Sequence, residues 1–518
     1  MRAGQPAGWR EWSGLALLAL PTMLLGLDVT ALYLVVPSLA VDLDPSATEL
    51  LWIMDAYGFF IAGFLVTMGT LGDRIGRRRL LMIGAAAFAA ASAFAAFAPG
   101  TLWLIVARAL LGVAGATLMP STLSLISTMF TDARQRALAI GVWATMFAAG
   151  MAAGPVVGGV LVTTFWWGAV FLIAVPVALL VLAGAPLLLP EYRTRAGGLD
   201  ALSVGLSLAA MLPIIYAIKH AAAHGLDFQA VAAVVLGGGA TVAFVRRQLR
   251  LVEPLLDMKL FANPAFSAAL SVLLIGLAGF GGVMYLVTQY LQLVTGLSPT
   301  ATGLWMGPPA LAMLIGAIGA PLLAGRIPPG VIMAGTLALS LAGYGLLASA
   351  GTDSRPAVVA GFALVYLGLG VIAALGTDIV MGAAPPDRSG SAAALSETVQ
   401  EFGIAAGVAL LGSLTTALYR RDIDTPAGLS ASVAETYGDS LAGASSVADR
   451  IPADAVDHAR NVFTGGLNTA ALAAGVAIAA ASSACFVMLR HIRTPDEPDR
   501  AAEPIASTPG SNRCQMKR

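Results

Sequence analysis

Long apolar runs separated by short polar connections make up almost the whole chain. A helix needs about 20 mostly apolar residues to cross the ~30 Å hydrocarbon layer of a bilayer. Runs of that length recur, and we expect fourteen spanning helices at 13–40, 48–70, 80–98, 102–129, 136–163, 167–190, 201–219, 228–245, 264–293, 298–325, 330–350, 356–383, 391–418 and 466–489. The pattern predicts an all-α polytopic membrane protein, and the even number of spans places both chain ends on one side.

Positive charge is divided unevenly between the two sets of connections. Every second connection contains arginines, whereas the connections on the other side of the membrane contain almost no Lys or Arg before the long segment 420–465. Lys219 and Arg355 are the exceptions. The arginine-containing set comprises 74–79, 134–136, 193–195, 246–259, 326 and 388. Because cytoplasmic loops carry an excess of Lys and Arg, we expect this set and both termini to be cytoplasmic, in a bacterial inner membrane.

Composition agrees with this class. Hydrophobic residues make up 58% of the chain and charged residues 11%, whereas a soluble domain has about 25% charged residues. The net charge is zero, so nothing indicates a nucleic-acid partner. The partners that the composition predicts are the lipid bilayer and small molecules.

The connection between the second and third runs is short, charged and rich in glycine. Residues 69–79 read Gly-Thr-Leu-Gly-Asp-Arg-Ile-Gly-Arg-Arg-Arg. Glycines allow two helix ends to approach closely, and Asp73 with Arg74, Arg77 and Arg78 is able to form ion pairs that break and re-form. Simple anchoring of a cytoplasmic loop requires only the arginines. The additional Asp and the spaced glycines indicate a gate.

This turn resembles the loop between the second and third helices of major facilitator superfamily transporters. The resemblance extends to 107–116, which contains Arg-x-x-x-Gly-x-x-Gly, and to 150–159, which resembles the motif that marks exporters in this superfamily. Later stretches at 166–176, 290–299 and 396–403 are also similar, although 166–176 lacks the family's Arg and Asn. The resemblance covers 13–490 and is strongest to fourteen-helix drug:proton antiporters that pump quaternary ammonium compounds, cationic dyes and fluoroquinolones.

The resemblance implies a major facilitator fold with two six-helix bundles and two inserted helices. The expected parts are a cytoplasmic N-terminus (1–12), the first bundle (13–190), the insertion (191–263), the second bundle (264–490) and a disordered cytoplasmic tail (491–518). In such transporters the halves rock about a substrate site near the middle of the bilayer. We expect a monomer. The external segment 420–465 has helical patterns at 431–447 and 452–463 and is either a helical hairpin or a flexible loop, with a lid as one possible role.

A few ionisable residues lie inside the predicted spans, where each costs several kcal/mol unless it is paired or hydrated. Acids outnumber bases among them, so the spans contain carboxyl groups that have no basic partner within the membrane. Glu397 and Glu401 are spaced to share one helical face. The full set is Asp28, Asp55, Arg108, Asp378, Glu397 and Glu401.

The resemblance assigns roles to these groups. Asp28 is expected to be the proton-coupling acid, and Arg108 its counter-ion when Asp28 is deprotonated. Asp55, Glu397, Glu401 and Asp378 are expected to bind substrate or protons, so that a proton and a cationic drug compete for one carboxylate. Each acid has the alternative of a permanent structural partner.

Aromatic side chains are candidates for lining the substrate cavity, because an aromatic face attracts a cation by about 0.5–2 kcal/mol. Packing and anchoring at the membrane surface are the alternative for each of them. The candidates are Trp52, Tyr57, Trp143, Phe147, Tyr285, Tyr290 and Phe402.

Two further groups are predicted to take part in gating. Asp132 is placed to meet Arg77 or Arg78 at the cytoplasmic side. Small residues and a proline in the fifth span permit close helix contact and a bend. The latter are Gly150, Gly154, Pro155, Gly158 and Gly159.

The energy source follows from what the sequence lacks. None of the three lysines follows a glycine, so a Gly-Lys phosphate loop is excluded and we expect a proton gradient rather than ATP, with no cofactor. His220 and His224 have the spacing of a metal pair, but no third ligand is in view. No nucleophile–base constellation lies in the spans, so an enzyme is not expected. We predict a proton-coupled exporter of hydrophobic cations; the alternative is an exporter of the same fold dedicated to one endogenous compound, antibiotic or lipid.

Overall fold

The computed structural model describes residues 7–191, 200–251, 254, 256, 258–324, 326–383 and 389–489, and these ranges contain helices but no strand. Fourteen of the described helices are long and apolar enough to cross a membrane. The first bundle contains α1 (Trp9–Leu43), α2 (Ala47–Ile75), α3 (Arg77–Ala96), α4 (Thr101–Met129), α5 (Ala133–Thr164), α6 (Ala169–Leu172) and α7 (Ala174–Leu188).

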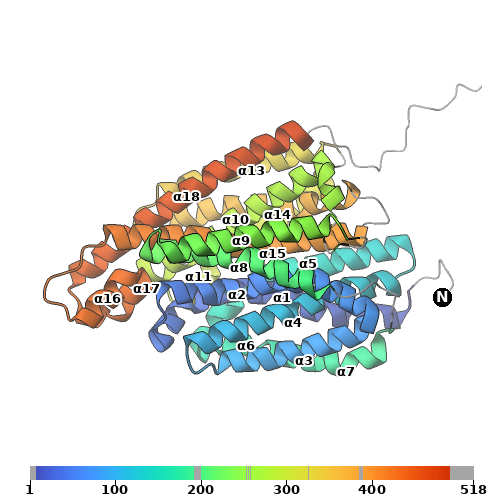
Figure 1. Ribbon diagram of the computed structural model, residues 1–518, viewed down its shortest axis with the longest axis horizontal. Coiled ribbons are helices and arrows are strands. Elements are labelled where there is room, and N and C mark those ends of the chain that lie inside the picture. Colours follow the sequence, from blue (N-terminus) through green and yellow to red (C-terminus); the bar gives the residue numbers. More distant parts are fainter. Residues whose placement is uncertain are drawn as a thin grey trace, which may run out of the picture.

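The inserted pair comprises α8 (Ala201–His224) and α9 (Phe228–Gln248), which pack against each other. Helix α8 also contacts α2 of the first bundle and α15 of the second. Figure 1 shows the pair lying across the front of the molecule between the two bundles. The insertion is therefore in contact with both halves.

The second bundle follows a 3₁₀ turn at Met258–Ala262. A short π-helical turn, Tyr290–Val294, extends its first helix. Its helices are α10 (Pro264–Gln289), α11 (Pro299–Trp305), α12 (Gly307–Ala324), α13 (Pro329–Ala348), α14 (Arg355–Ala383), α15 (Ser389–Asp422) and α18 (Ala453–Leu489). Between α15 and α18 lie α16 (Ala431–Asp439), α17 (Leu441–Ser446) and the 3₁₀ turn Ala448–Arg450.

The predicted spans agree with these helices to within a few residues, except at the last one. Helix α18 begins at Ala453 rather than near 466, so the helical pattern at 452–463 is continuous with the last spanning helix and is not a separate helix. The pattern at 431–447 is divided into α16 and α17. The predicted disordered tail, 491–518, lies outside the described residues.

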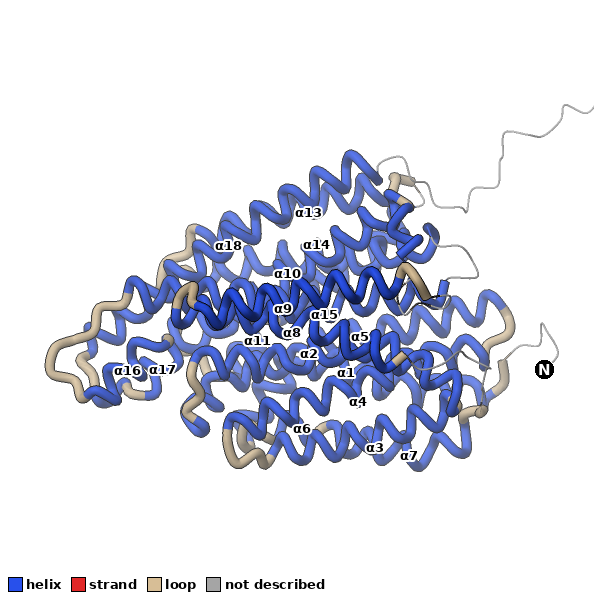
Figure 2. Tube along the Cα trace, viewed as in Figure 1, coloured by secondary structure: helices blue, strands red, loops and turns tan. Residues whose placement is uncertain are grey.

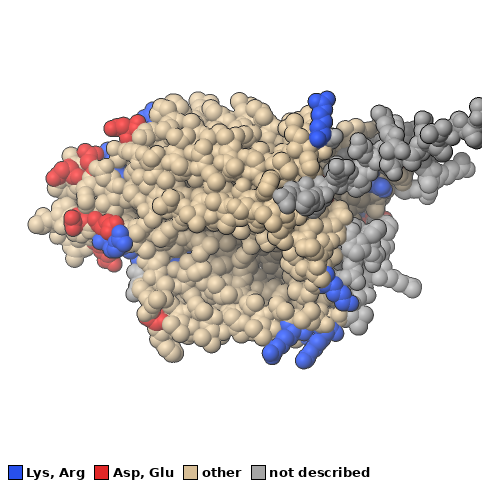
Figure 3. All heavy atoms as spheres, turned by 90° about the horizontal axis from the view of Figure 1, so that it is seen from above, with Lys and Arg blue, Asp and Glu red and all other residues tan. Residues whose placement is uncertain are grey.

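The two ends of the molecule differ in charge. The arginine end contains the α2–α3 turn, and the loop end contains residues 423–452, which connect α15 to α18. Connections gather at these two ends in Figure 2. Figure 3 shows Asp and Glu together with some Lys and Arg at one end, Lys and Arg at the other end, and a broad uncharged band between them. That band is the surface expected of a protein whose middle faces lipid.

Glycines allow the two bundles to meet closely at two places. A Cβ on Gly58 of α2 would lie 2.8 Å from the Cβ of Ala405 on α15. At the loop end, a Cβ on Gly159 of α5 would collide with the carbonyl oxygen of Pro299 on α11. The Thr300 hydroxyl donates a 3.0 Å hydrogen bond to the Gly159 carbonyl at the same seam.

Candidate functional site

Four buried charged residues of the first bundle and the inserted pair lie around one stretch of α2, residues 52–57. Helices α1 and α4 reach it with Asp28 and Arg108, and α8 reaches it with Lys219.

Arg108 ties three helices together. Its Nη1 atom lies 2.9 Å from Oδ2 of Asp28 on α1, and its Nε atom donates a 3.2 Å hydrogen bond to the carbonyl of Ile53 on α2. Its guanidinium also lies 4.7 Å from the ring centroid of Tyr57. Arg108 is 2% exposed and Asp28 7%, so this ion pair is shielded from water. The structure thus brings together the two residues that the sequence proposed as a coupling acid and its counter-ion.

The small residues that follow Arg108 explain how it reaches α2. A Cβ on Gly112 would lie 2.5 Å from the Tyr57 carbonyl oxygen, and one on Gly115 would lie 3.4 Å from the Tyr57 hydroxyl. Only a glycine at 112 permits this approach of α4 to α2. The Arg-x-x-x-Gly-x-x-Gly pattern is therefore a packing device that places a guanidinium against a neighbouring backbone.

Asp55 is paired with a residue that the sequence placed elsewhere. Oδ2 of Asp55 lies 2.8 Å from Nζ of Lys219 on α8, and neither side chain is exposed. The ammonium also lies 4.0 Å from the ring centroid of Trp52, a cation–π contact worth about 2 kcal/mol when desolvated. The prediction that Lys219 lies in an external connection is wrong, because α8 continues to His224 and buries it.

The carboxylates of the second bundle are arranged differently. Glu401 on α15 is buried, Glu397 is half-buried, and neither lies within ion-pair distance of a described Lys or Arg. Glu401 and Asp28 are close enough to interact electrostatically. The Tyr57 hydroxyl is close enough to interact electrostatically with both carboxylates. Asp378, by contrast, is exposed near the C-terminal end of α14, so it is not one of the buried acids that the sequence predicted.

The predicted aromatic residues fall into two groups. Trp52 and Tyr57 face the buried cations, and Phe402 packs in a small apolar cluster with Phe59. The others make structural contacts. The Trp143 indole donates to the Thr122 hydroxyl, and the Tyr290 hydroxyl donates to the Gly351 carbonyl. The Phe147 backbone lies against Gly26 of α1, and Tyr285 is buried near the loop end. The contact of Tyr290 holds the α13–α14 connection, which argues against a cavity role.

At the arginine end, no contact within the described part of the chain joins Asp132 to Arg77 or Arg78, so that prediction is wrong. Asp132 instead caps α5 by accepting a hydrogen bond from the Gln135 backbone, as is usual for Asp before a first helical turn. Arg78 pairs with Glu191 at 3.6 Å. Arg77 is buried and reaches the Pro120 carbonyl, Arg74 is exposed, and the Asp73 side chain lies outside the described residues.

The glycines of α5 face two partners. Gly150, Gly154 and Gly158 lie against the backbone or Thr30 of α1, where an added Cβ would not fit, and the Thr30 hydroxyl donates to the Met151 carbonyl. Gly159 and the Pro155 carbonyl lie against α11 of the second bundle. The motif therefore forms both a seam within the first bundle and a seam between the bundles.

His220 has an ordinary surface partner. Its Nε2 atom lies 2.9 Å from Oδ2 of Asp227, and its ring stacks on Tyr216. The backbone N–H of Ala230 and then His220 hold the pKa of Asp227 below its usual range. The His224 side chain lies outside the described residues.

Two functional candidates were missed by sequence reasoning. Lys219 was counted as a loop residue, although the apolar residues Ala221 to Ala223 that follow it indicate that the helix continues. Tyr33 of α1 is buried within electrostatic range of Asp55, Arg108 and Glu401. No pattern in the sequence singles it out.

The model of the Major Facilitator Superfamily matches residues 18–408. The multidrug efflux pump LfrA of Mycolicibacterium smegmatis is 43% identical over 93% of this chain and 97% of its own length. The methyl viologen resistance protein SmvA of Salmonella typhimurium is 34% identical over 90% and 96%.

The fold is also similar to a solved structure. A crystal structure of a bacterial homolog of the human lysosomal transporter Spinster, inward-facing and unoccupied, superimposes with a TM-score of 0.64. It covers 94% of this chain and 98% of that one at 17% identity. At this identity the likeness is one of architecture.

Proposed function

The chain belongs to the major facilitator superfamily and is a multi-pass membrane transporter, not an enzyme; from this premise we propose that it is a proton-coupled efflux antiporter of hydrophobic cationic compounds. The expected substrates are quaternary ammonium biocides, cationic dyes and fluoroquinolones. Its bundles rock about the buried charges around residues 52–57.

The observation that carries the proposal is the Asp28–Arg108 pair. A deprotonated Asp28 is neutralised by Arg108, whose Nη1 lies 2.9 Å away. A protonated Asp28 leaves Arg108 with the Ile53 carbonyl and the rings of Tyr57 and Phe171. Since the pair joins α1, α2 and α4, one proton selects between two arrangements of three helices. That is the two-state element a coupled transporter requires.

The cationic class of substrate is supported by the surplus of acids. Asp28 and Asp55 each have one basic partner, whereas Glu397 and Glu401 lie within ion-pair distance of no Lys or Arg among the described residues. An uncompensated carboxylate in a membrane is stabilised by a proton or by a cationic ligand. The name of SmvA refers to methyl viologen, an aromatic dication, and that relative covers nearly the whole of this chain.

Orientation and energy source complete the proposal. We place the arginine end and both termini in the cytoplasm of a bacterium, with the protein in the inner membrane as a monomer. The membrane potential supplies about 2.3 kcal/mol per charge per 100 mV, and protons use it through the carboxylates without ATP or a cofactor. In this orientation the loop end, with its seam between α5 and α11, faces outward.

The test is a panel of dye-efflux measurements in proteoliposomes. Monocations, dications and neutral compounds are compared while the pH gradient and the electrical potential are imposed separately. We expect a pH gradient to drive cations against the proton flow and to leave neutral compounds unmoved. Movement of cargo in the same direction as the proton, or efflux without any gradient, would contradict antiport. Export of only one neutral compound would favour the dedicated transporter.

A further inference from the structure

Lys219 occupies a place that suits an organic cation. Its ammonium lies 2.8 Å from the Asp55 carboxylate and 4.0 Å from the Trp52 ring centroid, and both charged side chains have no exposed surface. A carboxylate beside an aromatic face is how proteins bind ammonium ligands. Asp55 and Trp52 therefore have the features of an ammonium-binding site, and the cation that occupies this site is the protein's own Lys219.

The inserted pair alone supplies this cation. Apart from Lys219, no donor among the described residues reaches either oxygen of Asp55. Arg108 is engaged by Asp28 and the Ile53 carbonyl. If Lys219 leaves, Asp55 is free to take another cation, and if Lys219 stays, a second cation next to it is repelled.

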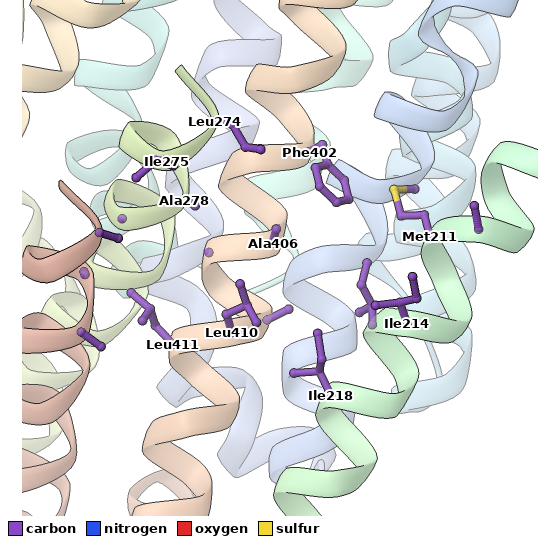
Figure 4. Close-up of a pocket in the computed structure, with 18 of the residues that line it drawn as sticks. Met211, Ile214, Ile218, Leu274, Ile275, Ala278, Phe402, Ala406, Leu410 and Leu411 are labelled. Carbon is purple, nitrogen blue, oxygen red and sulfur yellow. The ribbon is translucent and has the colours of Figure 1, made fainter. Parts of the chain in front are cut away.

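An apolar cavity lies beside this site. It has a volume of about 610 Å³ and is lined by residues of α8, α9, α10, α15 and α18, a size that suits a drug-sized apolar group. Figure 4 shows Met211, Ile214 and Ile218 of α8 on one side and Phe402, Ala406 and Leu410 of α15 on the other.

The cavity and the ion pair share a wall. Ile215 and Ala409 line the cavity and belong to the small apolar cluster against which Trp52 packs. Met211 and Phe402 also line the cavity and pack against the same cluster. Lys219 directly follows Ile218 of the lining. A molecule with a cationic head and an apolar tail would fit here, with its head at the Asp55 carboxylate and its tail in the apolar cavity.

We propose that Asp55 and Trp52 form a binding site for amphiphilic cations which Lys219 occupies as a built-in competitor, and that such a cation displaces Lys219 while its apolar tail lies in the cavity between α8 and α15. The inference rests on the proposed function and names the substrate class of this part of the site. It also gives the inserted pair a role, since α8 carries both the competitor and one wall of the cavity.

The first test removes the competitor. Purified wild type and Lys219→Gln are titrated with ethidium, an aromatic monocation, by fluorescence anisotropy. We expect Lys219→Gln to bind at least fivefold more tightly, and Asp55→Asn/Lys219→Gln to lose that gain and bind no better than wild type. Equal affinity of wild type and Lys219→Gln would overturn the proposal and leave a structural ion pair.

A conservative variant covers the case in which Lys219→Gln does not fold. Lys219→Arg keeps the charge, and a guanidinium holds a carboxylate with two hydrogen bonds. We expect it to be displaced less readily, so that ethidium binds at least threefold more weakly than to wild type. Unchanged affinity would count against displacement.

The second test fills the cavity. Ala406→Phe is compared with Ala243→Phe, its matched control on the exposed face of α9, for binding of tetradecyltrimethylammonium and tetramethylammonium. We expect Ala406→Phe to weaken binding of the long-chain cation at least fivefold and to leave the short one unchanged, with no effect of the control. Unchanged long-chain binding, with loss of a co-purified phospholipid, would assign the cavity to lipid and overturn its role here.

The outcomes separate the two proposals. A wild type that exports ethidium against a proton gradient, together with unchanged affinity in Lys219→Gln, removes only the Lys219 inference. A wild type that exports no cation removes the proposed function itself.

Discussion

The hydroxyl of Thr300 lies 3.0 Å from the carbonyl oxygen of Gly159, and this hydrogen bond joins the two bundles at the loop end. A second contact, 2.8 Å between the hydroxyls of Thr163 and Thr300, supports it. At this seam the backbones of α5 and α11 are in contact, because a Cβ on Gly159 or Gly303 would collide with a carbonyl oxygen of the other helix. Substitution of Gly159 therefore acts directly on closure.

Gly159→Val is expected to keep the loop end from closing. The new side chain would collide with the Pro299 carbonyl, so α5 and α11 must separate. We expect transport to fall at least tenfold and a thiol probe to label Thr300→Cys faster in the Gly159→Val background. Gly141→Ala is the control, because a Cβ there meets no atom within 4 Å. Normal transport by Gly159→Val would show that this seam need not close.

Asp28→Asn is expected to abolish coupling while largely preserving shape. The amide cannot exchange a proton, and it no longer neutralises Arg108. Removing one partner of a buried ion pair costs about 3–5 kcal/mol, so the melting temperature of the purified protein should fall as well. Cells that express Asp28→Asn should extrude a cationic dye no better than cells with an empty vector. Extrusion at the wild-type rate, at equal expression, would remove Asp28 from the coupling role.

The start of the inserted pair is held by an ion pair with a defined pH range. Hydrogen bonds from Arg247, and then from Ser203, lower the pKa of Asp200 to about 2, and Arg247 Nη2 lies 2.8 Å from Asp200 Oδ1. A folded-state pKa below the unfolded value of about 3.9 means that the pair stabilises the protein above about pH 4. That stabilisation is lost as the pH falls toward 2.

Arg247→Gln should therefore lower the melting temperature between pH 5 and 8, and the difference from wild type should shrink below pH 4. Arg246→Gln, at the exposed neighbouring position, is the control and should change little. A difference that stays constant down to pH 2 would show that Asp200 is not the group responsible.

The segment 423–452 is fastened to the start of α2 through Asp439. Its Oδ2 atom accepts a 2.6 Å hydrogen bond from the Ala47 backbone, and its other oxygen contacts Arg420. Asp439→Ala should raise the rate of proteolysis within 423–452 several-fold, because both contacts are lost. Asp422→Ala removes an exposed pair with Arg421 and serves as the control. Equal cleavage rates in the two variants would assign no anchoring role to Asp439.

Helix positions were predictable because lipid requires long apolar runs, and a span such as 102–129 coincides closely with α4. Residue partners were less predictable. The contact of Asp28 with Arg108 followed from a resemblance, whereas that of Asp55 with Lys219 joins segments far apart in the sequence that only the packed fold brings together. Hydropathy alone also assigns a charged residue near the end of a predicted span to a water-exposed connection. This explains two wrong predictions, the placing of Lys219 in a connection and the late predicted start of the last helix.

The glycine seam between α1 and α5 has a mechanical consequence. Where Gly150 and Gly26 bring one helix backbone against the other, there are no rotatable side chains to absorb sliding or tilting. We expect α1 and α5 to behave as a single stiff lever during the transport cycle. Rotation of this helix pair would move Asp28, at its middle, and Gly159, near its end, together. Protonation of Asp28 and closing of the loop end would then be mechanically coupled.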